Sequence, residues 1–445
     1  MTTYFLTPAE STLNRHPAQR FQTDVIGPVL EMRLRPGELT PLHWLGFDLY
    51  SESQNLIVWK IMLFEQGQAL PFELQFSALA HAQARVRLPL AACGQRAWQL
   101  GREGALLKPC CYHAAVDPTR LCRLVLEVMR KDDLPAVWRM TEPLFTSTAP
   151  APLQEAWLPK GPLLDRMGQS RLRGWPTKTP DLEALCQRLQ TQQLDRGAFP
   201  ESFSRFGGWK DGPRLEATGF FRVTRHENRW WLVDPEGFLF WSTGFDCVEP
   251  NVVSAYAGLT AAMEELPDAE THSEIQGAGA AKRGMLSHTA WNFYRIFGPE
   301  WRREWRNITA NQLRDWGFNT VANWSDNLLA REHQIPYIVT LKPDFRNCPM
   351  IFRDFPDVFH PAFAEAAEAL AAPLAECCGD PLVVGYFLMN EPTWGFSALL
   401  PAAREAAERT GIPASRLVVL DGADGHPSLA DLLAVGAPAP RVSFD

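Results

Sequence analysis

The residues with the clearest chemical potential lie together after an apolar run. Asn390, Glu391 and Pro392 follow the apolar residues 383–389, and Trp394 comes three positions after the carboxylate. A short, continuously apolar run is typical of a parallel strand buried on both faces, and proline ends such a strand because it has no N–H donor. The amide, the carboxylate and the aromatic ring suit a sugar. They can bind hydroxyl groups, transfer a proton to a glycosidic oxygen and stack on the C–H face of the ring.

The pattern around this run indicates where the carboxylate lies. An Ala-rich helical pattern over residues 363–378 comes before the run, and a further helix is predicted after it. In parallel α/β sheets and barrels, chemistry takes place just beyond the C-terminal ends of the strands. We therefore interpret Glu391 as catalytic. The alternative is a strand-end carboxylate that caps the next helix or pairs with an arginine.

A resemblance to a known family rests on this motif and on three segments upstream. Asn390-Glu391-Pro392 resembles the fourth-strand signature of the clan of retaining glycosidases built on (β/α)8 barrels. GFFRV at 219–223, RWWLVDPEG at 229–237 and WGFNT at 316–320 recur in order and resemble the agarase-like branch of that clan. The resemblance covers about residues 206–394. It implies that Glu391 is the general acid/base and that Asn390 binds the sugar 2-hydroxyl.

The same barrel end is expected to hold further substrate contacts. We predict strands at 239–245, 318–322 and 335–341, before the strand that ends at Glu391. Residues just beyond these strands are candidates for binding sugar, and together with Asn390 and Trp394 they are Asp246, Asn323 and Trp324. Asp246 is equally well explained as a turn residue. We interpret Asp326 as the N-cap of the following helix.

The predicted barrel is incomplete. The resemblance implies a nucleophilic Glu at the end of a seventh strand, but residues 416–420 are the last candidate strand, and Asp421 and Asp424 are the only carboxylates near its end. A whole barrel typically needs about 250 residues, more than remain after Leu239. We expect a (β/α)8-type TIM barrel truncated after strand four or five, by truncation, a frameshift or a genuinely short C-terminus. Either a partner chain would then cover its open edge, or the protein would be poorly stable.

The N-terminal third predicts a different architecture. Alternating runs at 29–34, 72–76 and 121–128, together with a strongly apolar run at 56–64, indicate an all-β sandwich domain over residues 1–145. The resemblance implies an accessory, carbohydrate-binding-like domain, although it could equally just pack on the barrel. His43, Trp44 and Trp59 could form a sugar platform or belong to the core.

Two further segments complete the predicted organisation. Residues 146–205 read as a Pro-rich linker with a helix at 181–194, and the barrel domain spans 206–445. Within it, 249–287 is Gly/Ala-rich and poorly patterned, and we expect a loop that shapes the sugar cleft. Residues 291–316 are predicted to be helical, with Trp301 in the core.

Composition narrows the possible partners. The net charge is −8 and no run of Lys or Arg occurs, so nucleic acid and anionic membranes are not expected partners. No apolar run approaches the ~20 residues of a membrane span, and no signal peptide is evident. Nine cysteines without metal-ligand spacing indicate reduced thiols in the cytoplasm. The glycosidase interpretation implies neither a metal nor an organic cofactor.

The sequence therefore predicts a retaining glycoside hydrolase that acts on β-linked oligo- or polysaccharides. The alternative is a non-catalytic carbohydrate-binding protein with a degenerate barrel.

Overall fold

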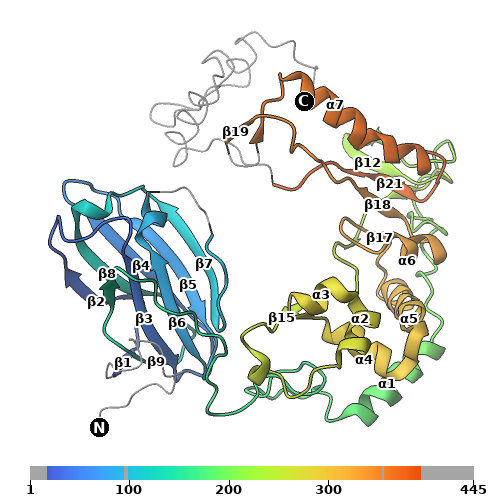
Figure 1. Ribbon diagram of the computed structural model, residues 1–445. Helices are drawn as coiled ribbons and strands as arrows, with labels where there is room; N and C mark the ends of the chain where they lie inside the picture. Colours follow the sequence, from blue (N-terminus) through green and yellow to red (C-terminus); the bar gives the residue numbers. More distant parts are fainter. Residues whose placement is uncertain (1–17, 95–98, 353–354, 392–445) are drawn as a thin grey trace. The chain divides into compact units, whose positions relative to one another are not determined.

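The computed structural model describes residues 18–94, 99–352 and 355–391 (Figure 1). The chain divides into two compact units. The first unit combines Met1–Leu189 with Pro250–Arg302, and the second combines Gln190–Glu249 with Arg303–Asp445. These units do not follow the predicted boundaries near 145 and 205, because Pro250–Arg302 groups with the N-terminal part of the chain.

The first unit contains two five-stranded antiparallel sheets, as the alternating runs predict (Figure 1). The first sheet consists of β1 (Gln19–Thr23), β9 (Ala136–Met140), β3 (Trp44–Ser51), β10 (Leu144–Thr146) and β6 (Gln83–Pro89). The second consists of β2 (Gly27–Arg33), β8 (Leu121–Arg130), β4 (Ile57–Glu65), β5 (Phe72–Ala78) and β7 (Leu106–His113). Alternate residues of β4, such as Ile61, are buried because successive side chains of a strand point to opposite faces.

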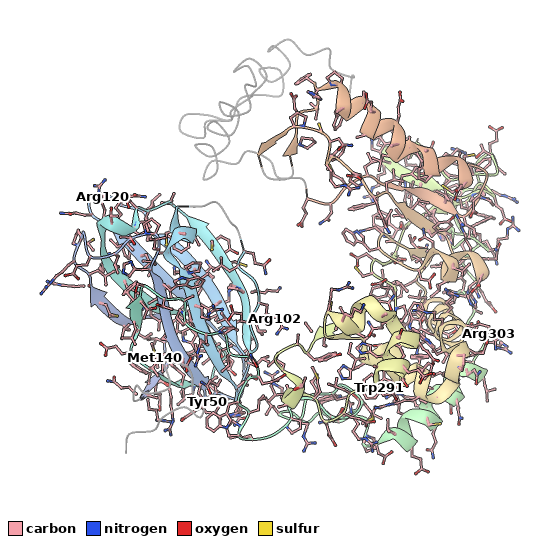
Figure 2. All side chains as sticks on the ribbon, viewed as in Figure 1. Tyr50, Arg102, Arg120, Met140, Trp291 and Arg303 are labelled. Atoms are coloured by element: carbon pink, nitrogen blue, oxygen red, sulfur yellow. The ribbon has the colours of Figure 1, made fainter. Side chains whose placement is uncertain are left out.

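Tryptophans fill the core of this sandwich. Trp59 and Trp138 are each 1% exposed, and their rings meet edge to face with centroids 6.1 Å apart. Met140, labelled in Figure 2, belongs to the same core. Trp59 is therefore a core residue and not part of a sugar platform. Trp44 is half-buried beside the guanidinium of Arg87, 5.2 Å from its ring.

The Pro-rich segment lies over the outer face of β3 and β6. There Asp48 and Arg85 form an ion pair in which both side chains are at most 2% exposed. Arg85 also donates to the carbonyl oxygen of Ala151 at 3.0 Å, and the ring of Trp157 packs on Tyr50 with centroids 5.4 Å apart. The predicted linker is thus, up to Leu189, a packed part of the first unit.

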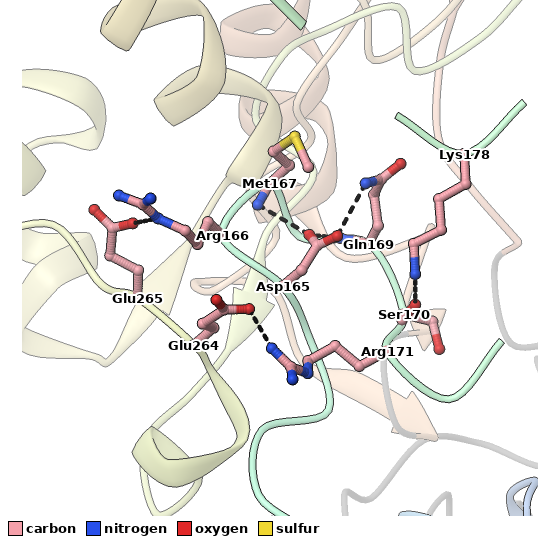
Figure 3. Close-up of polar contacts among 9 residues, drawn as sticks. All are labelled: Asp165, Arg166, Met167, Gln169, Ser170, Arg171, Lys178, Glu264 and Glu265. Atoms are coloured by element: carbon pink, nitrogen blue, oxygen red, sulfur yellow. Dashed lines mark hydrogen bonds and ion pairs between the residues drawn. The ribbon is translucent and has the colours of Figure 1, made fainter. Parts of the chain in front are cut away.

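The Pro-rich segment continues into a turn built on Asp165. One carboxylate oxygen of Asp165 accepts hydrogen bonds from the backbone N–H groups of Met167 and Gln169 (Figure 3). Two arginines that follow this residue form ion pairs: Arg166 pairs with Glu265, and Arg171 pairs with Glu264 (Figure 3). These ion pairs join the segment to the part of the first unit that follows Pro250.

Residues 249–287 are more regular than predicted. They contain β15 (Ser254–Ala255) paired with β16 (Met285–Leu286), and the helices α2 (Ala269–Gln276) and α3 (Ala278–Lys282). The prediction of a poorly patterned loop is wrong, because Asp268 caps α2 through the backbone N–H of Thr271 and Ile275 is fully buried. Its role in shaping a cleft stays a prediction.

The second unit is built around a parallel sheet. Its strands occur in the order β14 (Gly244–Phe245), β17 (Thr320–Val321), β18 (Tyr337–Thr340) and β21 (Val383–Phe387). Besides α2 and α3, the described residues form the helices α1 (Leu182–Leu194), α4 (His288–Phe297), α5 (Trp301–Asp315), α6 (Asn327–Glu332) and α7 (Pro361–Ala371). Helices in the connections between parallel strands are typical of β/α units. As predicted, Trp301 on α5 is buried.

An antiparallel sheet precedes these strands. It is formed by β11 (Arg222–His226), β12 (Arg229–Val233) and β13 (Leu239–Phe240). The first predicted barrel strand, 239–245, is therefore divided between β13 and β14. A small antiparallel pair, β19 (Met350–Phe352) with β20 (Phe355–Pro356), lies between β18 and β21 in the sequence.

The strand before Glu391 is less buried than its sequence predicts. Among the described strands β21 pairs only with β18, and Tyr386 is 42% exposed. The expected burial on both faces is wrong for the described residues, because β21 stands at an edge of their parallel sheet. Phe245 on β14, at the other edge, is 43% exposed. A partner chain over these edges stays a prediction.

Candidate functional site

Five of the predicted site residues lie beyond the C-terminal ends of the parallel strands. Asp246 follows β14, Asn323 and Trp324 follow β17, and Asn390 and Glu391 come shortly after β21. Because neighbouring parallel strands end at the same edge of a sheet, the structure brings these residues to one edge. Trp394, Asp421, Asp424 and the candidate strand 416–420 lie outside the described residues.

The two loops after β14 and β17 are joined by backbone hydrogen bonds. The N–H of Ala322 donates to the carbonyl oxygen of Phe245 at 2.7 Å, and the N–H of Cys247 donates to that of Asn323 at 2.9 Å. The hydroxyl oxygen of Ser325 accepts a hydrogen bond from the N–H of Val248 at 2.9 Å. Asn323 is thus held through its main chain, which leaves its side-chain amide for other partners.

Trp324 is held by two strands. Its backbone N–H donates to the Oγ1 of Thr340, the last residue of β18, at 2.8 Å. Its ring meets that of Phe387, the last residue of β21, with centroids 5.1 Å apart and planes at 73°. The side chain remains 40% exposed. An exposed aromatic ring in a fixed orientation is suited to stacking on a sugar.

Asp326 has a structural role, as predicted. Its side chain caps α6 by accepting hydrogen bonds from the backbone N–H groups of Leu328 and Leu329. The Nε of Arg306 also donates to it at 2.8 Å. These contacts occupy both carboxylate oxygens, so Asp326 is not a candidate for proton transfer.

Three of the four strand ends carry a non-glycine residue in the left-handed region. The φ angles are +52° at Cys247, +57° at Trp324 and +40° at Glu391. Such angles are uncommon outside glycine, and each costs on the order of 1–3 kcal/mol. Strain of this kind clusters at active sites and ligand clamps. Three of the eight described non-glycine residues with positive φ therefore lie at this edge, which supports it as the candidate functional site.

Strand spacing separates the two outermost carboxylates. Neighbouring strands lie about 4.8 Å apart, so Asp246 lies roughly 14 Å from Glu391 along the sheet, three strands away. A retaining pair is about 5–5.5 Å apart, so this spacing argues against Asp246 as the partner carboxylate of Glu391, and its role as a substrate contact stays a prediction. Asp344, after β18, pairs with Arg346, and this hydrogen-bonded guanidinium lowers the pKa of Asp344 to about 2.

The buried side-chain amide of Asn319 fixes the chain just before β14 and β17. Asn319 is 1% exposed and accepts a hydrogen bond from the N–H of Thr243, while its amide donates to the carbonyl oxygens of Gly207 and Trp241. Gly207 has φ +81°, and a Cβ there would lie 2.3 Å from that of Asn319. The WGFNT segment thus fixes how β13 leads into β14.

Sequence reasoning missed Thr340 and Phe387. Both lie inside strands predicted from apolar character, and nothing in that pattern distinguishes a residue that holds Trp324 from one that fills the core. Across the residues that the structure describes, no group of three potential metal ligands occurs. In the same residues, none of the helices has the length and apolar character to cross a membrane.

The fold and this edge define a class: an antiparallel sandwich joined to parallel β/α units with a carboxylate, an amide and an exposed tryptophan at the strand ends. No family model matches the chain. It is 28% identical to Beta-agarase B of Vibrio sp. (strain JT0107) over 279 residues, covering 52% of this chain and 28% of that protein. It is 26% identical to Beta-agarase A of the same strain over 263 residues, covering 52% of this chain and 26% of that protein.

The chain therefore spans little more than a quarter of these curated relatives. A solved structure, described as the crystal structure of an agarase, AgWH50C, is 20% identical and superposes with a TM-score of 0.50. That likeness covers 91% of this chain and 66% of the agarase, and it concerns the fold alone. The predicted resemblance to agarase-like glycoside hydrolases is confirmed by the two curated relatives.

Proposed function

We propose that this chain belongs to a glycoside hydrolase that cleaves O-glycosidic bonds in β-linked, agarose-type oligo- or polysaccharides with retention of configuration. The observation that supports this proposal is that Glu391 follows a parallel strand at the same edge of the sheet as Trp324 and Asn323, and that Glu391 and Trp324 both have left-handed backbone. Similarity to two beta-agarases supports the substrate class.

The proposed roles follow from chemistry and position. Glu391 protonates the glycosidic oxygen of the leaving sugar, and Asn390 binds the 2-hydroxyl group. Trp324 and Trp394 stack on C–H faces, while Asn323 and Asp246 bind hydroxyl groups further along the edge. We place these residues on a (β/α)8-type barrel of which the described strands form the first four. No metal or organic cofactor takes part in the proposed reaction.

The test is Glu391→Gln, with Glu368→Gln on the exposed side of α7 as the matched control. Loss of the proton donor is expected to lower turnover by about 10²–10⁴-fold. Sugar affinity stays within a few-fold, because the amide keeps the shape of the carboxylate. Reducing-end release from agarose-derived oligosaccharides measures turnover, and calorimetry measures affinity. Full activity in Glu391→Gln would remove this residue from the mechanism.

The second candidate is a non-catalytic carbohydrate-binding protein. It is favoured by the contacts of two described carboxylates near the strand ends, since Asp326 caps α6 and Asp344 pairs with Arg346. Without a second carboxylate near Glu391, sugar binding persists but the double displacement does not occur. If the wild-type protein binds oligosaccharide saturably but releases no reducing ends from it, the non-catalytic function is supported.

A further inference from the structure

We propose that Thr340 and Phe387 are positioning residues that lock Trp324 as a rigid sugar-stacking platform and tie it to the strand that leads to Glu391. This inference deepens the proposed function and rests on it. Neither residue is expected to touch the reacting atoms. Each acts through Trp324, one on its backbone and the other on its ring.

We call the contacts of Thr340 and Phe387 with Trp324 the clamp. Its first half is the hydroxyl group of Thr340. Its Oγ1 accepts the backbone N–H of Trp324 at 2.8 Å. Trp324 has φ +57°, which is unfavourable for a bulky side chain and persists only where surrounding contacts determine it. The loop is already fixed on the β14 side by the bond from Cys247 to Asn323. Thr340 therefore supplies the anchor on the β18 side.

The second half of the clamp is the ring of Phe387. Its edge-to-face contact with Trp324, 5.1 Å between centroids, is a preferred aromatic geometry that restricts rotation of the indole. Thr340 and Phe387 are directly opposite each other in the β18–β21 pairing. Next to them, the N–H of Leu341 donates to the carbonyl oxygen of Phe387 at 2.9 Å. One cross-strand pair thus holds both the backbone and the ring of Trp324.

The clamp has a consequence for binding. Trp324 keeps 40% of its surface exposed although its backbone and its ring are both held. A platform that is already ordered pays less conformational entropy when the sugar binds. Phe387 is also four residues before Glu391 on the same chain segment, so a displacement of Trp324 and a displacement of the acid/base are linked through β21.

The test compares two substitutions at Thr340. Thr340→Val keeps the branched shape but removes the acceptor, whereas Thr340→Ser keeps the acceptor. Loss of the platform is expected to weaken binding of an agarose-derived oligosaccharide by about 2- to 10-fold, with a smaller change in kcat. Thr340→Ser should restore affinity to within about two-fold of wild type. Phe387→Leu should weaken binding in the same range, and Phe387→Tyr should not.

A second readout needs no sugar. The protein is labelled with 5-fluorotryptophan, and the ¹⁹F resonance of Trp324 is assigned as the one missing from Trp324→Phe. We expect this resonance to shift or broaden in Thr340→Val and Phe387→Leu and to keep its position in Thr340→Ser. An unmoved resonance in both disruptive variants overturns the inference. A moved resonance in a chain that binds no oligosaccharide supports the clamp and instead defeats the proposed function.

Discussion

The sandwich of the first unit and the parallel sheet of the second are both made from apolar strands, yet they bury them differently. Ile61 and Phe76 in the sandwich are at most 1% exposed, whereas Phe245 and Tyr386 in the parallel sheet are more than 40% exposed. An apolar run thus predicts that a strand forms, but it does not say what covers its faces. The sandwich strands are covered on their inner faces, whereas the two edge strands of the parallel sheet leave Phe245 and Tyr386 exposed.

The largest expected effect comes from breaking the buried ion pair of the sandwich. Arg85→Met leaves Asp48 charged, buried and without this partner, and the free energy of unfolding of the first unit should fall by about 3–5 kcal/mol. Urea unfolding followed by the protection of β4 amides from hydrogen exchange measures the change.

The matched control for that variant is Arg166→Met, which removes an arginine that is 55% exposed from its pair with Glu265. Its unfolding curve should match the wild type within error, since exposed pairs contribute little. Equal effects in the two arginine variants would show that burial of the pair does not decide its contribution.

A second comparison makes the same substitution in the two regions, with an effect as large as the first in the sandwich and a smaller one in the parallel sheet. Phe76→Ala removes a ring that is 1% exposed and should lower the stability of the sandwich by about 3–5 kcal/mol. Phe245→Ala removes a ring that is 43% exposed and should cost about 1–2 kcal/mol, because much of it is already in water. Amide exchange in β4 and β17 reports each region separately. A larger loss at Phe245 would mean that this ring is covered in solution.

The smallest expected effect concerns how stability depends on pH. The free energy of unfolding should depend more steeply on pH in the first unit than in the second. Burial, and next the charge of Lys160, lowers the pKa of His81, and burial with Arg295 nearby lowers the pKa of His288. The unfolded chain then binds more protons below the usual pKa of 6.5, so stability falls as the pH drops from about 7 towards 5.

The variant that checks this dependence is His81→Asn, since asparagine tolerates the φ of +53° at that position. In this variant, the protection of the β4 amides from hydrogen exchange should decrease less between about pH 7 and 5 than in the wild type. Among the described histidines of the second unit, one has a lowered pKa, His333. The stability of the second unit should therefore decrease less steeply over the same pH range. Identical slopes in wild type and His81→Asn would exclude His81 as a source.

Much of the sandwich could be predicted from sequence, because β4 is a strongly apolar run and β5 and β8 carry apolar residues interrupted by polar ones. Strand β6 could not, since Gln83 and Arg85 make it read as polar. Those side chains are buried because Asp48 and the Pro-rich segment supply partners for them. Pairing across 37 residues is invisible to a local pattern.

For the candidate site too, the sequence could indicate some of the residues but not others. Asn323, Trp324, Asn390 and Glu391 could be chosen because polar residues directly follow apolar strands, and Asp326 because it precedes a helix. Thr340 and Phe387 could not, since their importance depends on which strands become neighbours. The roles of the chosen residues, and those of residues beyond Glu391, stay predictions.

The cover over the outer face of β3 and β6 has a consequence for how such proteins are assembled in evolution. Ala151 accepts a hydrogen bond from Arg85, Trp157 packs on Tyr50, and Leu163 joins the core of the sandwich. A gene rearrangement that moved only the strands would uncover the buried guanidinium. The exchangeable module is therefore longer than the sandwich, and the Pro-rich segment must be inherited with it.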